Sequence, residues 1–233
     1  MTLQQMRFDR RKWSALPLAD VMVAAQLLPG IVSLHGVVFD PIEIQSKRSK
    51  SRDHCFSRTG HRMNTHSIEI RRLLPADAEL YRDIRLEALR LSPEAFGSAY
   101  ETESVHPVGW FAERLERGAA IFGAFQAGKL AGIVGFVRAD GPKRQHKGAL
   151  VGMYVRQAAR GAGIGRLLVD AVLDFAAQSV ELVQLIVVKG NEPARRLYEA
   201  AGFVTYGLEL HALKIDGRYY DDILMAKDLV RRG

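Results

Sequence analysis

The chain has 233 residues, of which 48% are apolar and 25% charged, the composition of a soluble globular protein with one large domain or one domain and an appendage. The only cysteine, Cys55, excludes an internal disulfide, and no apolar run approaches the roughly 18 residues that span a bilayer, so we expect a cytoplasmic protein without a membrane partner. The net charge of +7 is concentrated near the start, because residues 1–62 hold ten Lys and Arg against five Asp and Glu.

The first part of the chain reads as an extension. Residues 44–66 are basic and polar and show no hydrophobic period, which is typical of a linker or a disordered segment. Met63 opens a stretch, "MNTHSIEIRRL", that resembles the natural start of a compact domain. We therefore expect an N-terminal extension over residues 1–66 and a single domain over residues 67–231, with a functional basic arm as the alternative.

The domain opens with a strand, two helices and three strands. Residues 67–73 alternate as a strand does, and residues 75–96 have the helical period, with Pro75 suited to a first turn. A second helix is predicted over 110–117, then a hairpin that turns at Ala127-Gly128-Lys129, and a strand over 148–156. The apolar stripe predicted for the first helix is Leu80, Ile84, Ala88 and Leu91.

The rest of the domain alternates helices and strands and then closes with a hairpin. A buried strand is predicted over 181–189 and a helix over 190–203, with Asn191 as its N-cap. Residues 204–229 read as two strands that turn at Asp216-Gly217. A long helix precedes the strand over 181–189, and its predicted apolar face is Ile164, Leu167, Leu168, Ala171, Val172 and Phe175.

Three glycines precede that long helix in "RGAGIGRLLVDAVLDFA", which starts at Arg160. The first turn of a helix leaves backbone N–H groups unpaired and carries partial positive charge, which suits an anion. The spacing fails the dinucleotide fingerprint G-x-G-x-x-G, because Arg166 stands where the third glycine would be, and no Lys-Ser/Thr pair completes a P-loop. The remaining pattern is R-x-x-G-x-G over Arg160, Gly163 and Gly165.

Two blocks, "MYVRQAARGAGIGRLLVDAVLDFA" and "LIVVKGNEPARRLYEAAGF", together resemble the GNAT superfamily of acyl-CoA-dependent N-acyltransferases. The resemblance extends from Ile68 to about Leu229 and implies an α/β (α+β) fold: one GNAT-like domain with a central mixed, mostly antiparallel, splayed sheet flanked by helices. It also implies an acyltransferase that moves an acetyl group from acetyl-CoA directly to an amine. We expect no metal, because no ligand cluster is visible in the sequence.

The resemblance further assigns a cofactor site. The strand ending at Val155 is expected to part from the strand at 185–188, so that the pantetheine arm fits between them as an extra strand. Tyr198 would protonate the departing thiolate, and it follows Asn191 by two helical turns, so both can face one groove. The residues expected to contact acetyl-CoA are Met153, Tyr154, Val155, Arg160, Gly161, Ala162, Gly163, Ile164, Gly165, Arg166, Asn191 and Tyr198.

The general base and the acceptor stay open. The strand "GALVGMYV" lacks the carboxylate that many superfamily members use, which leaves Glu103, Asp222 and Tyr154 as candidate bases. The expected acceptor wall is aromatic and acidic, which suits a cationic primary amine, either a small molecule or a protein or peptide amine. Its members are Tyr100, Glu101, Glu103, Tyr219, Tyr220 and Asp222.

Two other functions compete with catalysis. The missing strand carboxylate would suit a catalytically weak CoA-binding regulatory module. The basic extension suggests nucleic-acid binding, but it lacks interleaved aromatic residues, so we do not expect that partner. Self-association through the last strands, giving a homodimer, is an expectation from the fold alone.

Overall fold

The computed structural model describes residues 68–230, so Cys55 and the predicted extension over residues 1–66 lie outside the described part. Its strands form one seven-stranded mixed sheet in the order β1-β2-β3-β4-β5-β7-β6. The strands are β1 (Ile68–Arg72), β2 (Ala120–Gln126), β3 (Lys129–Arg138), β4 (Lys147–Val155), β5 (Leu182–Val188), β6 (Val204–Ile215) and β7 (Arg218–Asp228). Among the strands of residues 68–230, only the β4–β5 pair is parallel, so the predicted mostly antiparallel sheet is confirmed.

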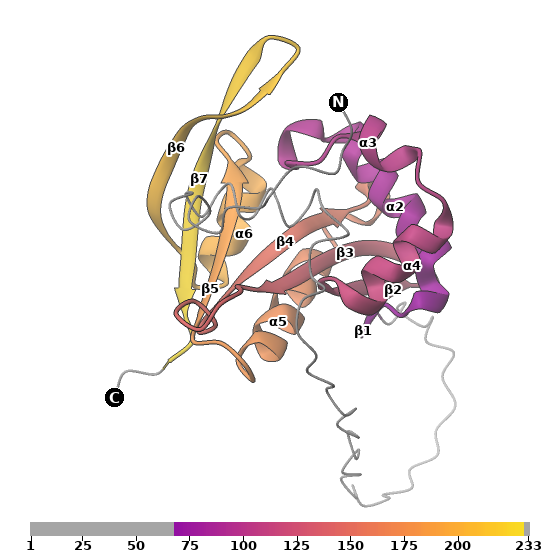
Figure 1. Ribbon diagram of the computed structural model, residues 1–233, viewed down its shortest axis with the longest axis horizontal. Helices are drawn as coiled ribbons and strands as arrows, with labels where there is room; N and C mark the ends of the chain where they lie inside the picture. The colour runs from indigo at the N-terminus through magenta and orange to yellow at the C-terminus, as the bar shows by residue number, and fades with distance from the viewer. Residues whose placement is uncertain (1–67, 231–233) are drawn as a thin grey trace, which may run out of the picture.

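Helices cover both faces of this sheet (Figure 1). The α-helices are α2 (Ala78–Leu91), α3 (Tyr100–Ser104), α4 (Val108–Arg117), α5 (Ile164–Ala176) and α6 (Glu192–Ala200). The short 3-10 turns are η2 (Pro75–Asp77), η3 (Pro93–Ala95) and η4 (Gln157–Ala159). Side chains of α2 and α4 form one core cluster with one face of β2 and β3, and those of α5 and α6 form a second cluster on the opposite face.

The first long helix is shorter than predicted, and a different face of it is buried. It ends at Leu91 because Ser92, whose φ of −146° and ψ of 55° are not helical, precedes Pro93, and proline disfavours helical backbone in the residue before it. Leu80 and Leu91 are exposed instead of buried. The buried face is centred on Tyr81, which meets Phe111 of α4 edge-on at 6.0 Å, and it includes Ile84, Arg85, Ala88 and Leu89.

The phase of α5 is also corrected by the structure. Leu167, which the sequence pattern placed on the apolar face, is 41% exposed in the first turn. The buried side is rotated around the helix from the predicted one, toward Val169 and Leu173. It consists of Ile164, Leu168, Val169, Val172, Leu173 and Ala176.

The sheet splits at its centre. The parallel strands β4 and β5 pair only at Lys147–Ala149 against Leu182–Gln184, and both continue beyond that point. Figure 1 shows them side by side at one end and diverging toward the other. Beyond the split, β5 stays paired with β7 up to Val188, and β4 stays paired with β3 up to Val155. The predicted splay is therefore present, with one unpaired edge of β4 facing it.

Candidate functional site

The loop between β4 and α5 contains glycines in conformations that leave its backbone exposed. Gly161 and Gly163 have φ of +83° and +78°, a backbone region that favours glycine, and a Cβ at either would meet no other atom within 4 Å. Gly165 is needed for packing, because a Cβ there would lie 3.1 Å from the Leu197 side chain. Gly161 and Gly163 are therefore favoured by the backbone conformation, and Gly165 by close packing.

Within residues 68–230, the backbone N–H groups of residues 161–165 donate no hydrogen bond. Arg160 and Arg166 differ, since their amides bond the carbonyls of Gln157 and Gly163. Five free amides at the start of a thirteen-residue helix suit a pyrophosphate, whose charge also interacts favourably with the helix dipole. The two arginine side chains serve the scaffold: Arg160 Nε donates to the Val155 carbonyl at 3.0 Å, and Arg166 pairs with Asp170.

The strand β4 carries a bulge where the sheet is split. Its register against β3 shifts between Tyr154 and Val151, and Gly152 inside this interval has φ of +62°. Side chains after the bulge alternate, with Met153 and Val155 packing toward the α5 cluster and Tyr154 toward the α2 cluster. The main chain of 153–155 therefore lines the open edge, as a thioester arm would need.

Tyr198 lies on α6 in the core cluster behind this opening. Its side chain is 5% exposed, meets Phe203 edge-on at 5.9 Å, and its hydroxyl has no hydrogen-bond partner within the described residues. Burial raises the pKa of Tyr198, so the phenol keeps its proton. Asn191 is the N-cap of α6, as predicted, and accepts a hydrogen bond from the Ala194 amide.

The three candidate bases have different surroundings. Glu103 is 2% exposed and receives two hydrogen bonds from Arg85, at 3.0 and 2.7 Å, with Arg114 at 3.7 Å. Burial acts to raise the pKa of Glu103, but these hydrogen bonds and positive charges outweigh it and hold the pKa below its ordinary value. Tyr154 donates to Glu87 at 3.0 Å, and burial followed by that hydrogen bond raises its pKa.

Asp222 is the candidate base that lacks the hydrogen bonds and positive charges found around Glu103. It is 8% exposed, and within residues 68–230 its carboxylate accepts no hydrogen bond. Burial, followed by the charges of Glu209 and Asp221, raises the pKa of Asp222 to about 6. It sits opposite Val188, the last residue of β5, so it lies where the sheet is open.

Asp222 and Tyr198 occupy opposite faces of the sheet. Ile223 and Met225 on β7, opposite Val187 and Leu185, pack in the cluster that holds Tyr198. Because side chains alternate along a strand, Asp222 points to the other face, toward the side of α2 and α3. The turn η3 lies close to β5 on that side and bounds the space above the split.

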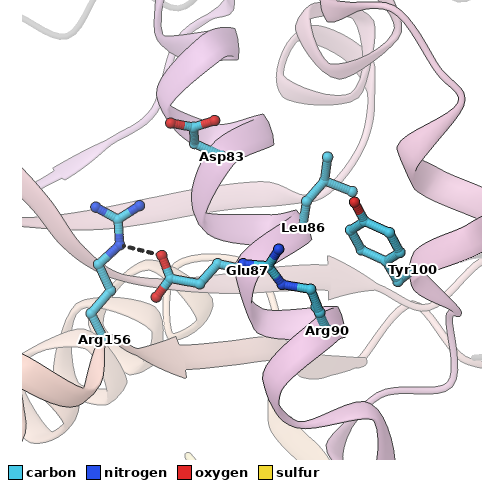
Figure 2. Close-up of a pocket in the computed structure, with 6 residues that line it drawn as sticks. All are labelled: Asp83, Leu86, Glu87, Arg90, Tyr100 and Arg156. Carbon is cyan, nitrogen blue, oxygen red and sulfur yellow. Dashed lines mark ion pairs between the residues drawn. The ribbon is translucent and has the colours of Figure 1, made fainter.

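The predicted acidic wall is not assembled as one surface. Tyr100 lines a pocket of about 290 Å³ beside α2 (Figure 2), whose other lining residues are Asp83, Leu86, Glu87, Arg90 and Arg156. In it Arg156 and Glu87 point toward one another and form an ion pair at 3.0 Å. Tyr219 and Tyr220 lie on the last hairpin, where the Tyr219 ring contacts that of His211 at a tilt of 30°, and Glu101 is exposed.

The pocket therefore has mixed charge. Sequence reasoning missed Arg85, Glu87 and Arg156. The available signal for Arg85 was its place four residues after Tyr81 and four before Leu89, on a buried helix face where an arginine needs a partner. Within the described residues, no three His, Cys, Asp or Glu side chains are grouped as metal ligands would be, and no helix there is long and apolar enough to cross a membrane.

Comparisons with known proteins agree with this geometry. The chain is 27% identical, over 133 residues that cover 55% of it and 82% of the relative, to YwnH of Bacillus subtilis (strain 168), named as a candidate phosphinothricin acetyltransferase. A GNAT-family acetyltransferase structure from Streptococcus pneumoniae has a TM-score of 0.63 at 24% identity, covering 70% of this chain and 99% of the other.

YncA from Salmonella typhimurium, solved with its cofactor acetyl-CoA, has a TM-score of 0.60 at 19% identity, covering 72% of this chain and 96% of the other. The sequence model of the acetyltransferase (GNAT) family matches residues 85–203, just over half of the chain, and spans the β4 bulge, the glycine loop and α6. The chain thus belongs to the acetyltransferase (GNAT) family and is an N-acetyltransferase that uses acetyl-CoA.

Proposed function

We propose that this enzyme transfers the acetyl group of acetyl-CoA directly to the primary amine of a small molecule. The observation that carries the proposal is the split between β4 and β5, which opens beside five free amides at the start of α5. A loop that binds pyrophosphate and a strand edge that binds the pantetheine arm are then contiguous. Bound there, acetyl-CoA supplies the acetyl group as a thioester.

The residues proposed to hold acetyl-CoA are those of the loop and the open strand edge. The amides of 161–165 bind the pyrophosphate, and the main chain of Met153, Tyr154 and Val155 pairs with the arm. The side-chain amide nitrogen of Asn191 has no partner within the described residues and is free to donate to the arm. Arg160 and Arg166 act through their side chains: Arg160 holds the loop to β4, and Arg166 joins α5 to α6 through the Ala200 carbonyl.

Tyr198 is the proposed acid. A neutral phenol behind the split can donate its proton to the departing thiolate, and its raised pKa keeps that proton in place at neutral pH. In Tyr198→Phe we expect turnover to fall about a hundredfold while the Kd for CoA changes little, which stopped-flow thiol release and calorimetry would measure. Unchanged turnover would remove Tyr198 from the mechanism.

Asp222 is proposed as the base in preference to Glu103. The lone pairs of Glu103 are occupied by Arg85, whereas the Asp222 carboxylate has none engaged and its pKa of about 6 suits proton uptake near neutral pH. Acid and base then flank the split from opposite faces of the sheet. The amine approaches from the α2 side and the thiolate leaves on the α6 side.

The assay that tests the proposal is acceptor-dependent release of CoA thiol, with a panel of small amines and peptides. The name of the Bacillus relative supports a small acceptor. Gly163→Val should abolish CoA binding, because a β-branched residue is strained at φ +78°. Arg144→Gln on the distant β3–β4 turn is the control. Normal CoA affinity in Gly163→Val would contradict the proposed loop.

We also propose that residues 67–231 are the transferase domain, that residues 1–66 are dispensable for turnover, and that two copies associate through the last strands. The edge strand β6 supports the last point, because Val204, Tyr206 and Leu210 on it are each more than half exposed. Leu210→Lys should shift the mass measured by light scattering to that of one chain. A chain that starts at Met63 should retain wild-type turnover.

A further inference from the structure

Only part of the Arg85 guanidinium is used within the protein. Its Nε and Nη2 donate to Glu103, while Nη1 has no hydrogen-bond partner within residues 68–230. The side chain as a whole is only 4% exposed, but Nη1 itself is not fully buried. Solvent therefore reaches this unused N–H group, and a bound ligand can reach it too.

Nη1 points at the bulge of β4. It lies 3.7 Å from the position that a Cβ of Gly152 would occupy, and it is the nearest atom there. Gly152 directly precedes Met153–Val155, the main chain proposed to hold the thioester arm. The free donor of Arg85 therefore faces the space where donor and acceptor meet.

The charge around this donor is positive. Arg85 and Arg114 share the single carboxylate of Glu103, so the buried cluster has one positive charge in excess. The adjacent pocket has mixed charge, because Arg90 and Arg156 line it together with Asp83 and Glu87. The excess positive charge of the buried cluster and the unused N–H of Arg85 therefore suit an amine that also carries a carboxylate better than a purely cationic amine.

We propose that the acceptor is an amino acid, an amine with a neighbouring carboxylate, and that Arg85 Nη1 binds that carboxylate. This inference rests on the proposed function, because it names the substrate of the same site. The amine nitrogen bonds to the acetyl carbon as the carbon–sulfur bond breaks. The amine proton passes to Asp222, and the thiolate takes a proton from Tyr198.

The first test uses the full-length protein and matched pairs of acceptors that differ only in the carboxylate. Lysine is compared with cadaverine, arginine with agmatine, and phenylalanine with phenethylamine, each by thiol release from acetyl-CoA. We expect kcat/KM for the better amino acids to exceed that of their decarboxylated partners by about tenfold or more, the contribution of one charge-assisted hydrogen bond. A preference for the decarboxylated amines overturns the inference and leaves the proposed function standing.

The second test asks whether Arg85 itself causes the preference for the amino acid. Arg85→Lys keeps the charge and can still pair with Glu103, but it loses the second donor direction. The preference for the amino acid should fall about tenfold in this variant, and should stay unchanged in the control Arg117→Gln, whose side chain is 81% exposed. An unchanged preference in Arg85→Lys would contradict the assignment.

A third readout needs no acceptor. The Kd for CoA, measured by calorimetry, should be the same in the wild type and Arg85→Lys, because the proposed contact is to the acceptor alone. A weaker Kd in Arg85→Lys would place Arg85 on the cofactor and overturn the proposal. If no member of any pair is acetylated while CoA still binds, the inference and the proposed function both fail.

Discussion

The two walls that face the split each bury one carboxylate, and the two carboxylates behave in opposite ways. On the α2–α3 wall, Glu103 is 2% exposed and bonded twice by Arg85, and its pKa lies below the ordinary value. On the β7 wall, Asp222 is 8% exposed and unbonded, and its pKa rises to about 6.

Burial alone would raise both pKa values, because it penalises the charged form of either residue. The difference comes from the partner. A guanidinium matched to Glu103 makes that carboxylate part of the scaffold, whereas Asp222 keeps the proton affinity that a base needs. Two acidic residues that look equivalent in the sequence are thus assigned to different tasks.

The largest expected effect comes from Asp222→Asn. Turnover should fall about a hundred- to a thousandfold, because a carboxamide cannot accept the amine proton. The free energy of unfolding at pH 7 should not decrease, since the ionised form is the one that burial disfavours: that penalty grows as pH rises from 3.8, the ordinary pKa, to about 6. Steady-state kinetics and urea unfolding measure the two quantities. Asp216→Asn in the hairpin turn is the matched control, and wild-type turnover in Asp222→Asn would exclude it as the base.

Glu103→Gln should affect stability more than protonation. It leaves the buried Arg85 without a counter-ion, and we expect the free energy of unfolding to fall by about 3 kcal/mol. The shape of the pH profile of kcat should be retained. Glu101→Gln, at an exposed position of the same helix, should unfold as the wild type does. If the acidic limb of the profile disappears in Glu103→Gln, the two carboxylates have exchanged roles.

The pH dependence of the wild type follows from the raised pKa of Asp222. The base must be ionised, so kcat should fall about tenfold per pH unit below about 6 and level off above it. Dividing the wild-type profile by that of Asp222→Asn cancels the ionisation of the acceptor. A ratio that does not vary between pH 5 and 8 would mean that Asp222 does not titrate in the reaction.

The smallest effect is expected from Glu209→Gln. Glu209 lies opposite Asp222 on β6, and its charge is the second cause of the raised pKa. Its removal should move the acidic limb of kcat to lower pH by less than one unit, because burial remains the main cause. A limb that moves to higher pH would show that the two carboxylates do not repel each other.

Local patterns were sufficient for most of the fold. The strand and helix order apart from α3, the Asn191 cap and the hairpin turns at Ala127-Gly128 and Asp216-Gly217 are set by residues close together in the chain, and the structure confirms them. The short helix α3 was missed, since five residues, "YETES", carry too few turns for a helical period to show. The faces of α2 and α5 were misplaced because the neighbouring helix or sheet decides which side is buried.

The free amides of residues 161–165 could be predicted from the sequence, because the glycines and the helix after them are consecutive and their backbone amides depend on local conformation. The difference between Glu103 and Asp222 could not. It depends on Arg85, which approaches Glu103 from another helix, and on the end of β5, where the neighbouring strand has already parted. Proton affinity responds to burial and to partners in space, and only the tertiary structure brings those together.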